Sequence, residues 1–326
     1  MSDTTFRKAI CAALEEELER DERVLFFGED VAAAGGVFAV TPGLYERFGP
    51  DPVFDTPISE LALAGAAFGS AVVGKRPVFE VMFGDFLILA MDSLVNQAAK
   101  FWYISNEQAP VPLTVRCAVG AGGRFGAIHS QTPTPWLLGV PGIKIVAPST
   151  PADAKGLLKS AIRDDNPVVV LEHKRLYSIS GPEGDGTVPI GEANVVREGS
   201  DITIVAAMRG VHDALAAAET LAGDGIEAEV IDLRTLRPID ERTVLESVAK
   251  TNRVVMYDEG PELGGWARGL LGAVAERGLE DIDDSWVIAS GELPIPYSPT
   301  LEDDFLPSAE RLADEIRARV KAPARA

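Results

Sequence analysis

The chain has 326 residues, enough for two ordinary domains, and its 46% hydrophobic and 25% charged residues are typical of a folded globular protein. Its formal net charge is −20, which argues against nucleic acid or an anionic membrane as a partner, because both attract a basic face. The longest strongly apolar run, residues 86–91, is far too short to span a bilayer.

The first half of the chain alternates short apolar runs with helical patterns, as α/β domains with mostly parallel sheets do. An amphipathic helix is expected within residues 1–24. The predicted strands are 24–29, 77–83, 111–116, 143–148 and 167–173. The predicted helices lie at about 59–74, 86–105 and 151–163. The helix at 86–105 begins with two turns that are apolar on nearly all sides, so it is either a core helix or one covered by another subunit.

Residues 176–191 are rich in Gly, Pro and Ser and lack periodicity, which predicts a linker. A second α/β pattern follows and continues almost to the C-terminus. We therefore predict an α/β fold with two open, mostly parallel-sheet domains, at residues 1–180 and 192–326, joined by a linker at 181–191.

The sequence around the two cysteines indicates a protein of a reducing compartment. Cys11 and Cys117 lie in apolar runs and have no metal-ligand spacing, so they are expected to be buried free thiols. The N-terminal 24 residues lack the charged and then apolar pattern of a secretory signal. We expect a cytoplasmic protein.

The negative charge is concentrated after residue 180. Residues 181–326 hold 14 basic and 29 acidic side chains, and therefore most of the net charge. A solvated acidic surface is the ordinary interpretation. The alternative is a docking face for a basic partner, since opposite charges steer such partners together.

Common catalytic motifs do not explain this chain. It has no serine-nucleophile elbow, no HExxH zinc motif and no Walker phosphate loop. The glycine run at 120–126 follows a predicted strand but leads into no helix, so dinucleotide binding is a weak interpretation.

Eight segments, collinear along almost the whole chain, together resemble one protein family. They are 28–31 (GEDV), 54–74, 80–100, 126–131 (GAIHSQ), 141–158, 161–169, 230–240 and 254–260. The combination of DTPISE, NQAAK, HSQ and DAKGLL is far more specific than any one of these motifs. The chain resembles the beta subunit of the decarboxylating component of 2-oxo acid dehydrogenase complexes, a thiamine-diphosphate-dependent, transketolase-like family that includes pyruvate, branched-chain and acetoin enzymes.

The resemblance implies a cofactor shared between two chains. In this family an alpha subunit binds magnesium and the diphosphate, the beta subunit holds the aminopyrimidine ring, and two of each form a heterotetramer. The metal-binding GDG motif of thiamine enzymes occurs here at 184–186 and 223–225, but the first lies in the linker and the second follows a helix as a turn. Neither is a predicted diphosphate site, as the resemblance to a beta subunit implies.

Individual residues match the family's site. Glu60 corresponds to the glutamate that hydrogen-bonds the pyrimidine ring nitrogen, and Met82 and Phe86 to side chains that pack against that ring. His129 corresponds to the active-site histidine near the substrate and the lipoyl group, as a proton donor or orienting group. Glu29 corresponds to a glutamate in a proposed proton relay between the two cofactor sites.

The family also implies a structural monovalent cation, commonly potassium. Its matching positions here are Leu113, Ala161, Ile162, Asp164 and Asn166. Backbone carbonyls with Asp and Asn side chains supply hard oxygen ligands that suit such an ion. A helix C-terminus followed by a polar turn is the ordinary alternative.

The function implied is oxidative decarboxylation of a 2-oxo acid with acyl transfer to lipoyl groups, active only with the alpha subunit. Acetoin cleavage with lipoyl acetylation is the alternative within the family, and a non-catalytic assembly subunit is the alternative from another class. A lipoyl-bearing acyltransferase component is expected to dock on the acidic C-terminal domain. The stretches 132–136 (TPTPW) and 264–269 (GGWARG) depart from the family pattern, so the substrate stays open.

Overall fold

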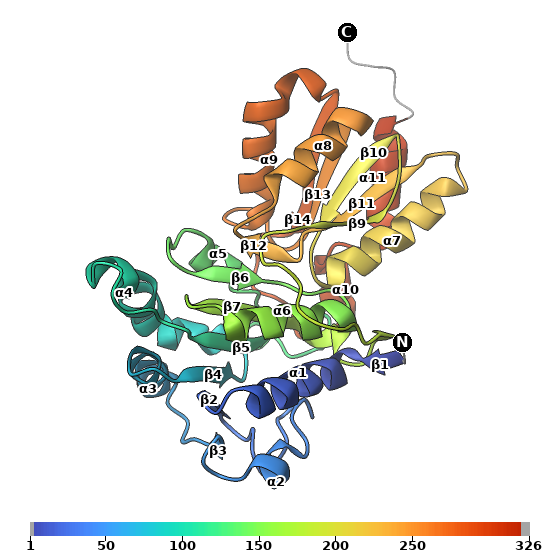
Figure 1. Cartoon of the computed structure of the whole chain (residues 1–326). Coiled ribbons are helices and arrows are strands. Elements are labelled where there is room, and N and C mark those ends of the chain that lie inside the picture. Colours follow the sequence, from blue (N-terminus) through green and yellow to red (C-terminus); the bar gives the residue numbers. More distant parts are fainter. Residues whose placement is uncertain (1–2, 321–326) are drawn as a thin grey trace.

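The structure is a computed structural model that describes residues 3–320. Figure 1 shows two α/β units, the N-terminal one below and the C-terminal one above. Each unit is built on one main sheet, of seven strands in the first and five in the second. The predicted α/β fold with mostly parallel sheets is confirmed.

The first sheet has the strand order β12-β6-β7-β5-β4-β2-β3, and its strands are parallel except at β12. The strands are β2 (Val24–Gly28), β3 (Val53–Asp55), β4 (Arg76–Val81), β5 (Thr114–Val119), β6 (Lys144–Val146), β7 (Val168–His173) and β12 (Thr235–Arg237). Every residue of the central strands β5 and β7 is buried, because helices cover both faces of a parallel sheet. The strand predicted at 111–116 begins three residues late, since Pro110 and Pro112 cannot donate to a ladder.

The helices of the first unit are α1 (Phe6–Arg20), α2 (Leu44–Phe48), α3 (Glu60–Val72), α4 (Ala99–Ile104), α5 (Thr134–Leu138) and α6 (Pro151–Arg163). The helix predicted at 86–105 is present as a helical stretch from Gly84 to Ile104, but its winding changes along its length. The structure has a 3₁₀ segment at Gly84–Ala90, a π-helical segment at Asp92–Ala98, and then α4. Changes of helical winding of this kind occur often beside functional sites.

The second sheet has the order β14-β13-β10-β11-β9, with only β9 antiparallel. Its strands are β9 (Asn194–Arg197), β10 (Ile202–Ala206), β11 (Ala228–Asp232), β13 (Arg253–Pro261) and β14 (Asp284–Ser290). The helices are α7 (Arg209–Ala222), α8 (Glu241–Thr251), α9 (Trp266–Gly278), α10 (Pro299–Phe305) and α11 (Ala309–Val320). Helices α7 and α11 pack together, as do α8 and α9, on opposite sides of the sheet in Figure 1.

The two units interlock. Strand β12 lies within the predicted second domain, yet it joins the edge of the first sheet beside β6. Strand β1 (Asp3–Thr5) pairs with β8 (Ser180–Pro182), at the start of the predicted linker. The boundaries at 180 and 192 stay a prediction, but β12 shows that the two parts are not separate in space.

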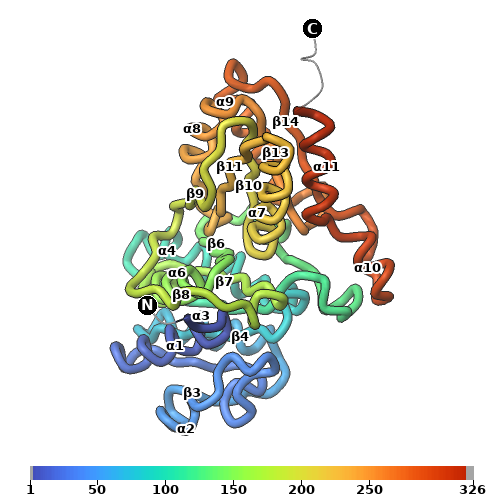
Figure 2. Tube along the Cα trace, turned by 90° about the vertical axis from the view of Figure 1, so that its right-hand side faces the viewer, coloured from blue at the N-terminus to red at the C-terminus, as the bar shows by residue number. Residues whose placement is uncertain are grey.

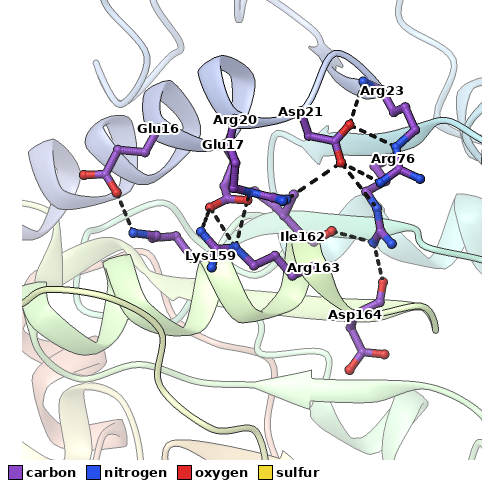
Figure 3. A network of polar contacts seen from close by, with 10 residues as sticks. All are labelled: Glu16, Glu17, Arg20, Asp21, Arg23, Arg76, Lys159, Ile162, Arg163 and Asp164. Carbon is purple, nitrogen blue, oxygen red and sulfur yellow. Dashed lines mark hydrogen bonds and ion pairs between the residues drawn. The ribbon is translucent and has the colours of Figure 1, made fainter.

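Helix α1 is tied to α6 by charged side chains (Figure 3). The fully buried Glu17 accepts hydrogen bonds from Arg163, with a shortest N···O distance of 2.6 Å, and from Arg20 at 2.7 Å. Lys159 of α6 donates to Glu16 at 2.5 Å. These contacts hold the first helix against the helix that leads into the predicted cation site.

Both cysteines are free thiols, as predicted; Cys117 is buried and Cys11 half-buried. Burial raises the pKa of each thiol, so both are neutral at physiological pH. Among residues 3–320, no helix is long and apolar enough to cross a membrane.

Candidate functional site

The predicted site residues gather at one edge of the first sheet. Glu29 follows β2, Met82 follows β4, and His129 lies in the loop after β5, while Glu60 begins α3 after β3. These strands are neighbours and parallel, so their carboxyl ends meet at the same edge. Ligands of open α/β sheets bind at this edge, where successive connections leave in different directions.

Glu60 is the first residue of α3 and is only 6% exposed. Within residues 3–320, no group donates a hydrogen bond to its carboxylate. Its oxygens are not among the enclosed side-chain atoms that lack a partner, so they stay open to a bound molecule. Glu60 is therefore suited to a ligand group that carries or shares a proton.

Glu29 lies within electrostatic range of Glu60. Partial burial and then the negative charge of Glu60 raise the pKa of Glu29. The segment that follows Glu29 is anchored to the end of β3, because the Asp55 carboxylate accepts a hydrogen bond from the Ala32 amide at 2.7 Å. The structure thus brings together two of the predicted acidic residues from separate connections.

His129 is half-buried in an aromatic cluster. Its ring lies edge-on to Phe83, with centroids 4.4 Å apart, and to Phe86, at 5.3 Å. The structure thus brings Phe86 against His129. Met82 is half-buried and directly precedes Phe83 in the sequence. Sequence reasoning missed Phe83, because a single buried Phe after a strand looks like ordinary core.

Asp85 holds the His129 loop against the 3₁₀ segment. Its Oδ1 accepts hydrogen bonds from the Gln131 backbone at 3.2 Å and from the Gln131 side chain at 2.8 Å. The other oxygen, Oδ2, and the Ser130 hydroxyl are buried without a partner among the described residues. Sequence reasoning also missed Asp85, whose only signal was the Asp in the segment 83–86 (FGDF).

Lys174, directly after β7, is another residue that sequence reasoning missed. Its ammonium lies 5.6 Å from the Phe83 ring centroid and 5.8 Å from that of Phe125, and it has no hydrogen-bond partner within residues 3–320. Burial lowers the pKa of Lys174 to about 8, against the opposing charge of Asp85. The Lys174 ammonium therefore lies against two rings of the aromatic cluster.

A cavity of about 420 Å³ opens between the two units beside this loop. It is lined by Ser130, Gln131 and Trp136 from the first unit and by Glu259, Ser290 and Leu293 from the second. Its volume is in the range of small-molecule sites. The TPTPW stretch contributes to the lining, and a Cβ on Gly264 would lie 3.5 Å from Pro135 Cβ. The two stretches that depart from the family pattern therefore meet in space.

The five predicted cation ligands lie around the turn after α6, but oxygens of four of them, Leu113, Ala161, Ile162 and Asp164, already have partners. The carbonyls of Ile162 and Asp164 accept hydrogen bonds from Arg76 Nη1 at 3.0 and 3.1 Å (Figure 3). Lys144 pairs with the Asp164 carboxylate, which also accepts from the Asn166 amide nitrogens. The Leu113 carbonyl accepts a backbone hydrogen bond from Val168, and the Ala161 carbonyl accepts one from Asp164.

The oxygen chemistry at this turn suits a potassium ion, but the ion would use the second lone pairs of carbonyls that Arg76 already contacts. The guanidinium also opposes a second cation at close range. The cation site stays a prediction. Among residues 3–320, no cluster of three His, Cys, Asp or Glu side chains could hold a metal.

Comparisons with known proteins agree with this geometry. The transketolase pyrimidine-binding domain family matches residues 2–179, and the transketolase C-terminal domain family matches residues 191–312. A solved structure described as a split-gene transketolase in an inactive beta4 tetramer has a TM-score of 0.80, covering 97% of this chain and 98% of that one. Its sequence identity is 24%, so it supports the fold alone.

Curated relatives match at nearly full length. The acetoin:2,6-dichlorophenolindophenol oxidoreductase subunit beta of Cupriavidus necator is 46% identical, with 97% of each chain covered. The 2-oxoisovalerate dehydrogenase subunit beta of Bacillus subtilis is 43% identical, covering 97% of this chain and 98% of the relative. The pyruvate dehydrogenase E1 component subunit beta of Rickettsia felis is also 43% identical, covering 96% and 97%. The chain therefore belongs to the family of the beta subunits of 2-oxo acid and acetoin dehydrogenases, with a transketolase-like fold.

Proposed function

We propose that this chain is the beta half of a thiamine-diphosphate-dependent decarboxylating component, which acts on a 2-oxo acid and transfers the acyl group to a lipoyl group. The observation that carries the proposal is Glu60, a largely buried residue at the start of α3 whose carboxylate receives no hydrogen bond from any group within residues 3–320. It lies in the domain that matches the pyrimidine-binding family.

The residues at the sheet edge fit the pyrimidine half of the cofactor. When bound, thiamine diphosphate supplies the carbon nucleophile that attacks the 2-oxo group. Glu60 would hold a proton between its carboxylate and the pyrimidine ring nitrogen. Met82 and Phe86 would pack against the ring. His129 would orient or protonate groups on the substrate side.

An alpha subunit would hold magnesium and the diphosphate. A large exposed apolar surface on the first unit supports such a partner. Its members are Ile58, Leu61, Val73, Ile88, Leu89, Tyr103 and Ile104, each more than half exposed. They lie on or beside α3, the 3₁₀ segment and α4, and the contact of Phe68 with Phe101 joins α3 to α4. Exposed apolar side chains gathered on neighbouring elements are a common feature of subunit interfaces.

The experiment that tests the proposal reconstitutes the chain with its alpha subunit. The pair should oxidise 2-oxo acids with 2,6-dichlorophenolindophenol as electron acceptor only when thiamine diphosphate and magnesium are present. The chain without alpha subunit should be inactive. Activity of the chain by itself, or a pair inactive on every substrate tested, would contradict the proposal.

Acetoin is the second candidate substrate, because a relative named for acetoin is 46% identical. Relatives named for 2-oxo acids are 43% identical, so the margin is small. Parallel assays with pyruvate, branched-chain 2-oxo acids and acetoin, compared by kcat/KM, decide between the substrates.

A lipoyl-bearing acyltransferase component is the further partner that we propose, docked on the second unit. The excess of acidic side chains at 181–326 supports attraction of a basic binding domain. The affinity should then fall steeply as ionic strength rises. An affinity insensitive to salt would indicate an apolar interface.

A further inference from the structure

Two carboxylates of the second unit bind the backbone of the loop that carries His129. Glu302, on α10, accepts hydrogen bonds from the amides of Gly122 at 2.9 Å and Arg124 at 3.2 Å. Glu259, on β13, accepts from the Ala121 amide at 2.7 Å. Figure 2 shows α10 away from the other helices of its unit, at the level of the first unit. The loop and its anchors thus belong to different units.

The Glu302 contact is fully enclosed. Its side chain has no exposed surface, and its charge is balanced by Arg124 Nη1 at 2.6 Å. Gly122 and Arg124 have φ of +82° and +64°, the left-handed conformation that a residue with a Cβ adopts reluctantly. Backbone amides in such turns converge into a concave anion site. The loop conformation therefore depends on the carboxylate that fills it.

The loop transmits its position to His129 through aromatic rings. Phe125, directly after Arg124, lies 6.1 Å from Phe83, and Phe83 lies 4.4 Å from His129. The base of the loop is closed by a hydrogen bond from the Gly120 amide to the Gln131 carbonyl, at 3.4 Å. A shift at residues 122–124 would therefore displace the aromatic support of the histidine.

Glu259 fixes the loop at a second point, on the side that faces the end of β7. Glu259 also contacts His173 Nε2 at 2.7 Å. A Cβ on Gly120 would lie 2.2 Å from the same His173 nitrogen, so the backbone is pressed against this ring. The loop is thus held between the end of β7 and the two carboxylates.

We propose that Glu302 is a positioning residue for His129, so that the second unit sets the geometry of the histidine in the first. The inference rests on the proposed function, because it concerns the half-reaction in which His129 meets the lipoyl group. The unit on which the acyltransferase is proposed to dock would then also hold the loop that serves acyl transfer.

The first test uses Glu302→Gln in the reconstituted alpha–beta enzyme. The amide keeps the shape of the side chain but directs an NH₂ group toward backbone N–H donors. The ratio of lipoamide acylation to dye-coupled decarboxylation should fall about 10- to 100-fold, as a misplaced catalytic group causes. This ratio does not depend on the amount of folded enzyme, so a merely structural role would leave it unchanged.

The control is Asp304→Asn, which removes one exposed carboxylate from the same helix. Its ratio should stay within about twofold of the wild type. In a His129→Ala background, Glu302→Gln should lower the ratio no further, because both changes act through one group. Independent, multiplying effects, or an unchanged ratio in Glu302→Gln, would overturn the inference.

The second test needs no turnover. Amide hydrogen exchange of residues 120–131 in the full chain should become about tenfold faster or more in Glu302→Gln, and stay unchanged in Asp304→Asn. Unchanged exchange in Glu302→Gln would overturn the inference. A wild-type pair that converts no substrate would instead contradict the proposed function, and the exchange result would still decide whether Glu302 holds the loop.

Discussion

Phe86 and His129 are in edge-to-face contact, with ring centroids 5.3 Å apart, although one follows β4 and the other follows β5. This contact places a predicted cofactor-packing residue beside a predicted substrate-side residue. Edge-to-face packing favours defined orientations of two rings. The pair therefore connects the proposed pyrimidine site to the loop that carries the histidine.

Glu60→Gln should abolish turnover of the reconstituted pair while leaving assembly intact. The amide cannot share a proton with the pyrimidine nitrogen, and we expect a loss of at least about 1000-fold in kcat, in the upper part of the usual contribution of one acid–base group. Steady-state kinetics and size-exclusion chromatography of the pair measure the two effects. The matched control is Glu46→Gln, an exposed position on α2. Near-normal activity of Glu60→Gln would refute the assignment.

His129→Ala should separate the two half-reactions. Dye-coupled decarboxylation should persist, because Glu60 and the cofactor site are unchanged. Acylation of lipoamide should fall about 100-fold or more, the usual contribution of a general acid. Rapid-quench assays of each half-reaction check this. Equal losses in both half-reactions would place the histidine in the first step instead.

Arg116→Met should destabilise the chain by about 3–5 kcal/mol, the cost of leaving buried charges unpaired. The Arg116 guanidinium is almost wholly buried and donates to Glu172 at 2.7 and 2.8 Å and to Glu80 at 2.6 Å. Urea unfolding measures the change, with the exposed Arg242→Met as control. A loss below about 1 kcal/mol would mean that both carboxylates become neutral or hydrated at little cost.

Asp232 should make stability fall as pH rises. Burial raises the pKa of Asp232 to about 7, although its carboxylate accepts hydrogen bonds from Ser149 and from the Arg234 amide. The unfolded chain has a pKa near 3.9, so between about pH 4 and pH 7 the folded state binds more protons. The free energy of unfolding contributed by this group therefore declines over that window, by at most about 4 kcal/mol.

Asp232→Asn should remove that decline, because the amide stays neutral. Urea unfolding at several pH values should show the variant gaining stability relative to wild type between about pH 4 and pH 7. A difference that is independent of pH would mean that Asp232 is ionised throughout.

Potassium should stabilise the chain if the predicted cation site binds it. Replacing Na⁺ by K⁺ at constant ionic strength should raise the Tm, and an ion at 100 times its Kd adds about 2.7 kcal/mol. Asn166→Ala should remove the difference between the ions. Equal Tm values in both salts would indicate that Arg76 alone supplies the positive charge at the Ile162 and Asp164 carbonyls.

Local patterns were enough to predict the two α/β units, whereas the site residues were predicted from the resemblance of short segments to a known family. Strand and helix periodicity depends on neighbours in sequence, and the segments around Glu60 and His129 match a known family within a few residues of each side chain. Both positions then follow from the strand order, because parallel neighbours share one carboxyl edge.

Only the tertiary structure decided which side chains support the site. Glu302 binds the Gly122 amide from 180 positions away, and Arg116 meets Glu172 from 56 positions away. Strand β12 likewise joins a sheet whose other strands all precede residue 174. Periodicity within a segment describes which face of that segment is apolar, but the partner of a buried charge is set by which elements the whole chain brings together.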